Sequence, residues 1–483
     1  MEKLVPTIGI EVHVELKSNA KVFSTAQNAY SNEPNTFVDI RDLGYPGTLP
    51  KLNLGVIHLA LRAALACNCS INQHMHFDRK NYFYPDLPKG YQITEQDTPI
   101  GHDGFLEIKV NGEKKKIGIE RIHIEEDTCK SIHTLEGTYL NYNRAGVPLI
   151  EIVSKPDIHS PEEAVAYVET LRETLLYLGI SDVKIEEGSM RCDTNISLAP
   201  ESSDTLGTRC EIKNIGSVAG VGNALRYEME RQRDILTSGD KVTPETLRFD
   251  DKTGKTILMR VKETGNDYRY FPEPDIPYVN IPDEWINDEQ NNMPILPAEL
   301  RIRYDKLGIN QNNIATMISN IDLSKFLSSI EDKVDVVTAV NLLTGDILSY
   351  LNKNHITIDE LNLDATHFIT LVNLISSGKL SSKQTKEVLP IMLSKDEDPT
   401  EIMKDLGMEQ ISDTSALTEI VKKIIADNPA SVTDYKAGKD RAIKYLMGQI
   451  MKETKGQANP KLVNDLLKEE LDKQNWTHKN YIV

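Results

Sequence analysis

The sequence predicts an α+β protein in which a β-rich half precedes a helical part. The prediction rests on three observations: short alternating apolar and polar runs up to about residue 290, a proline-rich passage at 267–297, and apolar residues at helical spacing beyond it. With 483 residues, the chain is long enough for about three domains with sizeable cores. We expect domains at 1–292, 293–405 and 406–473, with an extension of unassigned role at 474–483.

The predicted elements follow in chain order. Strands with one buried face are expected at four places: 8–16, 117–124, 149–153 and 190–198. An alanine-rich helix is expected around 59–66, and a longer one at 160–178, where Ser160 can cap a first turn that begins with Pro161. Apolar residues from Ile314 to Leu351 predict short amphipathic helices, and after a break near 406–413 a last helical segment runs to about residue 473.

Composition and charge exclude several classes of protein. The net charge of −18 excludes an evenly basic surface that coats nucleic acid, although a local basic patch is compatible with it. No apolar run approaches the roughly 18 residues of a membrane span, and the N-terminal residues resemble neither a signal nor a transit peptide. Five cysteines are typical of a reducing cytoplasm rather than a disulfide scaffold.

The common nucleotide, metal and nucleophile motifs are missing. The nearest approach to a phosphate-binding loop, at 253–256, has Phe249 where that loop requires glycine. Cys67 and Cys69 are separated by one residue, too few for a zinc knuckle, so we expect two buried apolar side chains. No HExxH or GxSxG motif occurs. Any nucleotide or metal must therefore be held by a less familiar arrangement.

Polar residues alternate with apolar ones on the predicted strands. Successive side chains of a strand point to opposite faces, so three strands each present a polar face: Glu11, His13 and Glu15; Arg121, His123 and Glu125, followed by Glu126 and Asp127; and Arg191, Asp193 and Asn195. Glu151 stands inside an apolar run, where an unpaired carboxylate is costly.

Two interpretations of these faces remain open. Each face can be the solvated side of an antiparallel strand. Alternatively, histidine between carboxylates suits a divalent cation, and the faces converge with nearby bases on a site for magnesium-assisted phosphoryl transfer. The bases available for such a site are Lys80, Lys89, Arg191 and Lys213.

Several long segments carry a family resemblance. They occur at 9–16 (GIEVHVEL), 77–93 (FDRKNYFYPDLPKGYQI), 123–131 (HIEEDTCKS), 143–157 (NRAGVPLIEIVSKPD), 183–198 (VKIEEGSMRCDTNISL), 267–275 (DYRYFPEPD) and 434–460. In this order, they resemble the B subunit of the bacterial aspartyl/glutamyl-tRNA(Asn/Gln) amidotransferases.

The resemblance implies a β-rich cradle domain, built on an antiparallel sheet with flanking helices, then a helical domain and a small helical tail. It implies a cytoplasmic bacterial ligase that uses ATP and Mg²⁺ to phosphorylate the side-chain carboxylate of misacylated Glu-tRNA(Gln) or Asp-tRNA(Asn). Ammonia from a separate amidase (glutaminase) subunit then forms the amide, and a third, small subunit makes up the heterotrimer.

The resemblance also implies roles for individual residues. It places metal binding and catalysis on Glu11, His13, Glu126 and Glu151, with Glu125, Glu187 and Asp193 as second choices. ATP or acyl phosphate would be held by Lys80, Lys89, Arg191 and Lys213, together with Glu187 and Asp193. Arg269 and Tyr270 would meet the acceptor end of tRNA, although their segment can equally be a proline-locked loop at a domain interface.

The chain departs from the family pattern in a few places. Asn141, Thr128 and Cys129, and Lys155 replace the usual residues beside the expected site. Many relatives carry two cysteine pairs for zinc, but the corresponding positions 23–26 and 39–42 here read FSTA and DIRD, so no zinc is expected.

The tail is locally basic. Between Lys436 and Lys461 there are seven Lys or Arg residues against two Asp or Glu, which suits contact with RNA phosphates as well as a solvated helix face. The residues expected to contact tRNA are Lys436, Lys439, Arg441 and Lys444. A tRNA-binding scaffold without chemistry and a stand-alone phosphohydrolase are the two alternatives to the ligase subunit.

Overall fold

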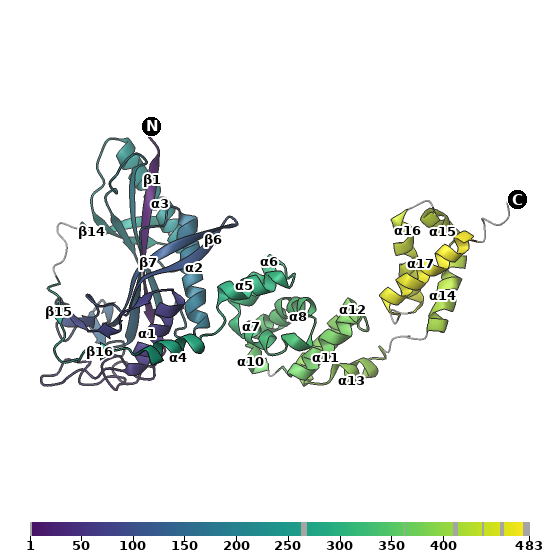
Figure 1. Ribbon diagram of the computed structural model, residues 1–483, viewed down its shortest axis with the longest axis horizontal. Helices are drawn as coiled ribbons and strands as arrows, with labels where there is room; N and C mark the ends of the chain where they lie inside the picture. The colour runs from purple at the N-terminus through teal and green to yellow at the C-terminus, as the bar shows by residue number, and fades with distance from the viewer. Residues whose placement is uncertain are drawn as a thin grey trace. The chain divides into compact units, whose positions relative to one another are not determined.

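The computed structural model describes residues 2–261, 268–361, 363–408, 414–436, 439–454 and 458–476. The chain divides into two compact units, Met1–Glu299 and Leu300–Val483, and Figure 1 shows strands and a few helices in the first and helices in the second. The boundary expected near residue 405 lies next to residues 409–413, which are outside the described part.

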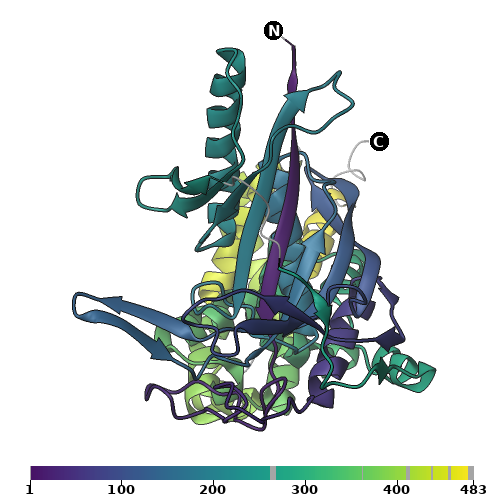
Figure 2. The ribbon, with the colours of Figure 1, turned by 90° about the vertical axis from the view of Figure 1, so that its left-hand side faces the viewer.

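A nine-stranded sheet forms the centre of the first unit. In spatial order its strands are β14 (Lys255–Val261), β13 (Glu245–Asp250), β12 (Cys210–Lys213), β11 (Met190–Pro200), β1 (Leu4–Glu15), β10 (Pro148–Ser154), β7 (Glu113–Glu126), β6 (Gly101–Val110) and β2 (Ser70–Ile71). Figure 2 shows β1, in purple, running between its neighbours near the middle of this sheet. The predicted strands at 8–16, 117–124, 149–153 and 190–198 are therefore confirmed as parts of β1, β7, β10 and β11.

Helices cover the apolar face of the sheet (Figure 1). They are α1 (Leu54–Ala66), α2 (Pro161–Tyr177) and α3 (Val218–Thr237). The Ser160 side chain caps α2 by accepting a hydrogen bond from the Glu163 N–H, as its sequence predicts. Ile10, Val12 and Val14 of β1 are buried in the core beneath these helices. The opposite face of the sheet is thereby left to the polar side chains.

Most strand pairs in the large sheet are antiparallel, but β12 and β13 run parallel. Parallel neighbours need a crossover connection, and α3 supplies it between these two strands. The expected antiparallel sheet with flanking helices is thus a mixed sheet.

Three smaller sheets complete the first unit, with helix α4 (Asp283–Asn291). They pair β15 (Phe271–Pro272), β4 (Asp78–Asn81) and β5 (Tyr91–Thr94); β16 (Val279–Asn280) with β3 (His74–Met75); and β8 (Lys130–Thr134) with β9 (Gly137–Asn141). The buried Cys67 and Cys69 follow α1, as expected.

The described part of the second unit is helical. Its α-helices are α5 (Pro297–Lys306), which begins at the boundary, α6 (Gln311–Ser319), α7 (Ile321–Ser328), α8 (Val336–Leu342), α9 (Leu348–Asn354), α10 (Ile358–Leu361), α11 (Ala365–Ser376), α12 (Ser382–Lys395), α13 (Pro399–Asp405), α14 (Thr414–Asp427), α15 (Pro429–Lys436), α16 (Asp440–Glu453) and α17 (Pro460–Trp476). The last four enclose a hydrophobic cluster of their own around Val421, Leu446 and Leu467. Among the described helices, none combines the length and apolar character needed to cross a membrane.

Candidate active site

The polar face of the sheet brings together residues that are far apart in sequence. Antiparallel pairing sets His13 opposite Glu151 on β10 and opposite Arg191 on β11. Glu151 in turn lies opposite His123 on β7. Side chains directly opposite each other on one face lie close enough to interact, so the register of β1, β10, β7 and β11 assembles the site.

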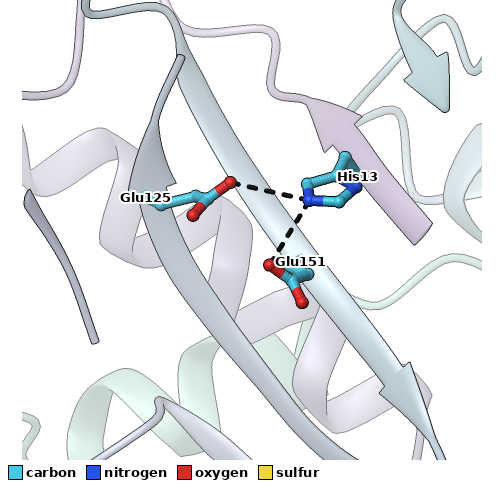
Figure 3. A group of neighbouring side chains, drawn as sticks. All are labelled: His13, Glu125 and Glu151. Carbon is cyan, nitrogen blue, oxygen red and sulfur yellow. Dashed lines mark ion pairs between the residues drawn. The ribbon is translucent and has the colours of Figure 1, made fainter. Parts of the chain in front are cut away.

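The histidine–glutamate cluster consists of His13, Glu125 and Glu151 (Figure 3). The His13 Nε2 atom lies 3.3 Å from Glu151 Oε2 and 3.8 Å from Glu125 Oε1. His123 Nε2 is 3.4 Å from the same Glu151 oxygen. Glu151 therefore has two imidazole partners. They stabilise a carboxylate that would be costly if it were unpaired inside an apolar run.

Charges within this cluster shift the pKa values of its members. Burial disfavours the charged form of His13, but the hydrogen bond to Glu151 and the charges of Glu151 and Glu125 outweigh it and raise the His13 pKa to about 9. Burial would raise the Glu151 pKa, but His123 and His13 hold it well below its usual value. The carboxylate of Glu151 is thus held ionised between two imidazoles.

An acidic cluster of Glu11, Asp193 and Glu211 lies on the neighbouring strands β1, β11 and β12. Lys213 Nζ is 2.6 Å from Asp193 Oδ2 and 2.9 Å from Glu211 Oε1, and the Asn195 amide donates to Glu11 Oε1 at 2.9 Å. Burial, followed by the charge of Glu151, raises the pKa of Glu11, because charged carboxylates this close disfavour one another.

Both clusters fit divalent cations. In each of them, one ligand atom per residue lies within 4.8 Å of the others. The acidic cluster sets three carboxylates against the ammonium group of Lys213, and such an oxygen-rich donor set matches Mg²⁺. The histidine–glutamate cluster includes an imidazole nitrogen, which also accepts Mn²⁺ or Zn²⁺.

Cationic side chains border the clusters. Burial lowers the pKa of Lys80, but the charges of Glu125 and Glu151, together with the nearby tyrosines, outweigh it and raise the pKa above its usual value. Lys80 Nζ lies 5.0 Å from the centroid of the Tyr268 ring. Arg191 donates to Asp127 Oδ2 at 3.0 Å, and Arg144 approaches the same oxygen at 3.4 Å. These groups supply positive charge around the polar face.

Glu126 does not join the histidine–glutamate cluster. It points to the opposite side of β7 from Glu125, where it accepts hydrogen bonds from Lys89 Nζ and, at 3.0 Å, from the Ile93 N–H. Glu126 and Lys89 line a pocket of about 120 Å³ with Tyr91. The structure thus brings together His13, Glu151 and Glu125, and it places Glu126 and Lys89 as a separate pair.

The other predicted residues lie in varied surroundings. Glu187 is an exposed residue of the turn before β11, paired with Lys184 at 2.9 Å. Tyr270 lies near Lys80 and packs edge-on against Tyr268. The Arg269 carbonyl, one residue earlier, accepts a hydrogen bond from the Asn81 amide at 2.7 Å, and the predicted DYRYFPEPD segment starts with Asp267, which is outside the described residues.

In the tail, three of the predicted basic residues can be placed. Lys439, Arg441 and Lys444 are exposed at the start of α16, and Lys439 forms an ion pair with Asp434 at 2.9 Å. The Lys436 side chain lies outside what the structure describes, as do residues 477–483 of the predicted extension.

The segments 23–26 and 39–42, at which the resemblance leads us to expect no zinc, are linked by polar groups. Thr25 Oγ1 donates to Asp39 Oδ2 at 3.4 Å, and the Asp39 N–H donates to Asp42 Oδ2 at 2.9 Å. The fully buried Lys21 donates to the same Asp42 oxygen at 3.0 Å. Hydrogen bonds and an ion pair thus connect these two segments.

The residues that depart from the family pattern have partners of their own, outside both clusters. Thr128 Oγ1 donates to Asp86 at 3.2 Å, and Asn141 Oδ1 accepts from the N–H groups of Asn35 and Asn143. Lys155 pairs with Asp103 at 2.7 Å. None of these partners belongs to either cluster.

The site residues missed by the sequence-based selection are Glu211, His123, Asp127 and Arg144. His123 and Asp127 were visible on a predicted polar strand, and Glu211 beside Lys213 was visible as an acid–base pair. The missing signal was strand register, because Asn195 lies opposite Glu211 only once β11 and β12 pair. Arg144 is in the loop before β10, where alternation gives no indication of direction.

Comparison with known proteins agrees with this architecture. Residues 6–287 match the GatB/GatE catalytic domain, and residues 324–471 match the GatB domain. The chain therefore belongs to the GatB/GatE family, and the predicted resemblance is confirmed.

Its curated relatives are named as one particular protein, the B subunit of aspartyl/glutamyl-tRNA(Asn/Gln) amidotransferase. The protein of Limosilactobacillus reuteri (strain DSM 20016) is 50% identical over 467 residues, 96% of this chain and 98% of the relative. That of Pediococcus pentosaceus is 48% identical over 469 residues, with 96% and 98% covered. That of Enterococcus faecalis is 47% identical over 470 residues, with 97% and 99% covered.

Proposed function

We propose that this chain is the activating subunit of a glutamine-dependent tRNA amidotransferase. It uses ATP to phosphorylate the side-chain carboxylate of Glu or Asp esterified to tRNA, and ammonia then replaces phosphate to give Gln-tRNA(Gln) or Asn-tRNA(Asn). Activation is needed because a carboxylate is a poor electrophile and its oxygen a poor leaving group. Because aminoacyl-tRNA is consumed by ribosomes, we place the reaction in the bacterial cytoplasm.

The observation that carries the proposal is the pair of clusters on one polar face. Glu11, Asp193 and Glu211 would hold Mg²⁺, and the histidine–glutamate cluster would hold a second divalent cation. Such cations neutralise charge on phosphate oxygens during phosphoryl transfer.

Protein groups next to the clusters perform the remaining tasks. Lys80, close to Glu125 and Tyr270, is placed to bind an anionic phosphate or acyl phosphate. Lys213 pairs with Asp193, and Arg191 pairs with Asp127. When the nucleotide binds, both cations form hydrogen bonds to its phosphate oxygens in place of part of these ion pairs. Glu187, on the exposed turn before β11, has the weakest support among the predicted residues.

The relatives' designation as a B subunit suggests further subunits, and we propose a heterotrimer with an amidase (glutaminase) that supplies ammonia and a small third chain. Exposed apolar side chains support a protein partner. On the β8–β9 hairpin, Leu135 is fully exposed, and Ile132 and Tyr139 are 40% and 54% exposed. Exposed apolar groups gathered on one hairpin are typical of an interface.

We propose the tail as the tRNA contact, through Lys436, Lys439, Arg441 and Lys444, with Arg269 and Tyr270 near the acceptor end. The double variant Arg441→Glu/Lys444→Glu should weaken tRNA binding and lower the salt dependence of affinity by about one to two units of slope. The double variant Lys468→Glu/Lys473→Glu on α17 changes the net charge by the same four units at two exposed lysines and is the charge-matched control. Equal losses in both would attribute the effect to net charge alone.

The reaction is tested with the complete complex, Mg²⁺, ATP and misacylated Glu-tRNA or Asp-tRNA, with and without glutamine. We expect ADP formation that depends on tRNA and amide formation that depends on glutamine or ammonia. ATP turnover without tRNA would favour a phosphohydrolase, and tRNA binding without ADP would favour a scaffold.

Two variants test which carboxylate of β7 belongs to the site. Glu125→Gln should lower tRNA-dependent ADP formation at least ~100-fold, because it removes a charge from the histidine–glutamate cluster, a loss of the size seen when charge stabilisation of a transition state is removed. Glu107→Gln, an exposed change on β6, should leave the rate unchanged. Glu126→Gln removes the charge facing Lys89 without touching the cluster. If Glu126→Gln lowers ADP formation as much as Glu125→Gln does, Glu126 belongs to the site, as the resemblance implies. If ADP formation is unchanged, Glu126 does not belong to the site.

A further inference from the structure

A third group of metal-ligating residues lies outside both clusters of the polar face. It consists of His76, which precedes β4; Asp78, the first residue of β4; and Asp97, in the turn after β5. One nitrogen or oxygen from each residue lies within 4.8 Å of the others. No role for these three side chains follows from the proposed phosphoryl transfer.

Asp78 is 1% exposed, and its two oxygens have different surroundings. Oδ2 accepts hydrogen bonds from the N–H groups of Gln96 at 2.7 Å and Asp97 at 3.2 Å. Oδ1 is buried and, within the described part of the chain, has no hydrogen-bond donor. It faces His76 Nε2 at 3.3 Å. Burying a carboxylate oxygen without a hydrogen-bond donor costs free energy. A bound ligand at this atom would offset that cost.

The ring of His76 is oriented by Thr98. The Thr98 hydroxyl donates to the His76 carbonyl at 3.3 Å, and the same oxygen lies 3.2 Å from His76 Nδ1. In the tautomer that carries its proton on Nδ1, the ring donates this proton to Thr98 Oγ1, which also accepts the His76 backbone N–H at 2.9 Å. Nε2 then presents a lone pair. Among the described residues, Nε2 also has no hydrogen-bond partner.

The lone pair of Nε2 and the charged Oδ1 of Asp78 thus face each other across 3.3 Å. Two electron-rich atoms in this arrangement repel each other unless a cation lies beside both. Asp97, which is exposed, adds a second carboxylate from the solvent side. A hydrogen bond from Nδ1 to a neighbouring group is the usual support of a metal-binding histidine.

We propose that His76, Asp78 and Asp97 bind a divalent transition-metal ion of the Zn²⁺ class. One imidazole nitrogen and two carboxylate oxygens supply three ligands, and water completes the coordination on the side where Asp97 is open to solvent. The ion links the start of β4 to the turn after β5. It thereby stiffens the small sheet on which Lys80 stands, whatever reaction the polar face performs.

The test measures Zn²⁺ bound per chain in the full-length protein within its complex, after removal of metal and dialysis against Zn²⁺. His76→Gln and Asp97→Asn should each bind about one equivalent less than the wild type, because each removes one of three ligands. His74→Gln, two residues away, is the matched control, because His74 is exposed and contacts Asn280 instead. It should bind as much as the wild type.

Zn²⁺ can also bind at the histidine–glutamate cluster, so His13→Gln separates the two sites. The visible absorption bands of bound Co²⁺ should lose one component in His76→Gln and a different one in His13→Gln. Zn²⁺ should raise the Tm of the wild type by more than that of His76→Gln, since binding to the native state stabilises it. Asp97 is exposed, so Asp97→Asn tests the site with little risk of misfolding.

Equal Zn²⁺ content and equal Tm shifts in the wild type and in both variants would overturn the proposal. In that case His76 and Asp78 form an ordinary ion pair without a metal.

Discussion

The charge of Glu151 controls the protonation of His13, and Glu151→Gln removes that charge. The side chain keeps its shape, but His13 loses the charged partner that lies 3.3 Å away and remains partly buried. The His13 pKa of about 9 should therefore fall to or below the unperturbed value of 6.5.

The size of the effect on stability follows from the pKa. Raising a pKa from 6.5 to about 9 corresponds to about 3 kcal/mol, at about 1.4 kcal/mol per pKa unit. Because the folded-state pKa lies above the unfolded one, this stabilisation is complete below about pH 6.5 and disappears as the pH rises through about 9. The wild type should exceed Glu151→Gln in unfolding free energy by about 3 kcal/mol more near pH 6 than near pH 10.

Urea unfolding in the presence of a chelator measures this difference, and the chelator keeps cations from replacing the proton. Glu107→Gln, an exposed change on β6 that removes a carboxylate paired with Lys114, should show the same difference from wild type at both pH values. A gap between wild type and Glu151→Gln that does not change with pH would refute the assignment of the proton to His13.

Three further changes have defined outcomes. Lys213→Met removes the ammonium group between Asp193 and Glu211, so the Tm should fall in chelator and partly recover with Mg²⁺; a Tm insensitive to Mg²⁺ would argue against a cation there. Arg79→Lys breaks a two-bond pairing with the buried Glu273 and should cost about 2–3 kcal/mol in urea unfolding; a cost below ~0.5 kcal/mol would contradict it. Leu467→Ala should destabilise helices α14–α17 by about 2–5 kcal/mol, measured by hydrogen exchange, with protection of the first unit unchanged.

Much of the first unit could be predicted from local pattern. Alternation located β1, β7, β10 and β11, because one face of each is buried against helices and the other is polar. The parallel pairing of β12 and β13 could not be predicted, because strand order is a long-range property that no local pattern encodes.

In the candidate site too, local alternation predicted which face a residue lies on, but not its partners on other strands. Alternation placed Glu125 on the same face as His123, and the structure confirms that placement, whereas the preference for Glu126 came from the family resemblance. Glu126 shares the parity of Ile122 and Ile124 and therefore points to the other side of β7. The partners of Glu151 depended on register with β1 and β7, which single-strand reasoning does not supply.

The central place of β1 has a consequence for how the chain is made. β1 leaves the ribosome before both of its partners, which end only at residues 154 and 200. At about 5–20 residues per second, synthesis reaches the second partner roughly 10 to 40 s after β1 is complete. For that time, a long apolar strand has both edges unpaired, which invites pairing with another nascent copy. Glu11 and Glu15 give the waiting strand negative charge that opposes such pairing, so Glu11 of the acidic cluster also protects the strand against aggregation during synthesis.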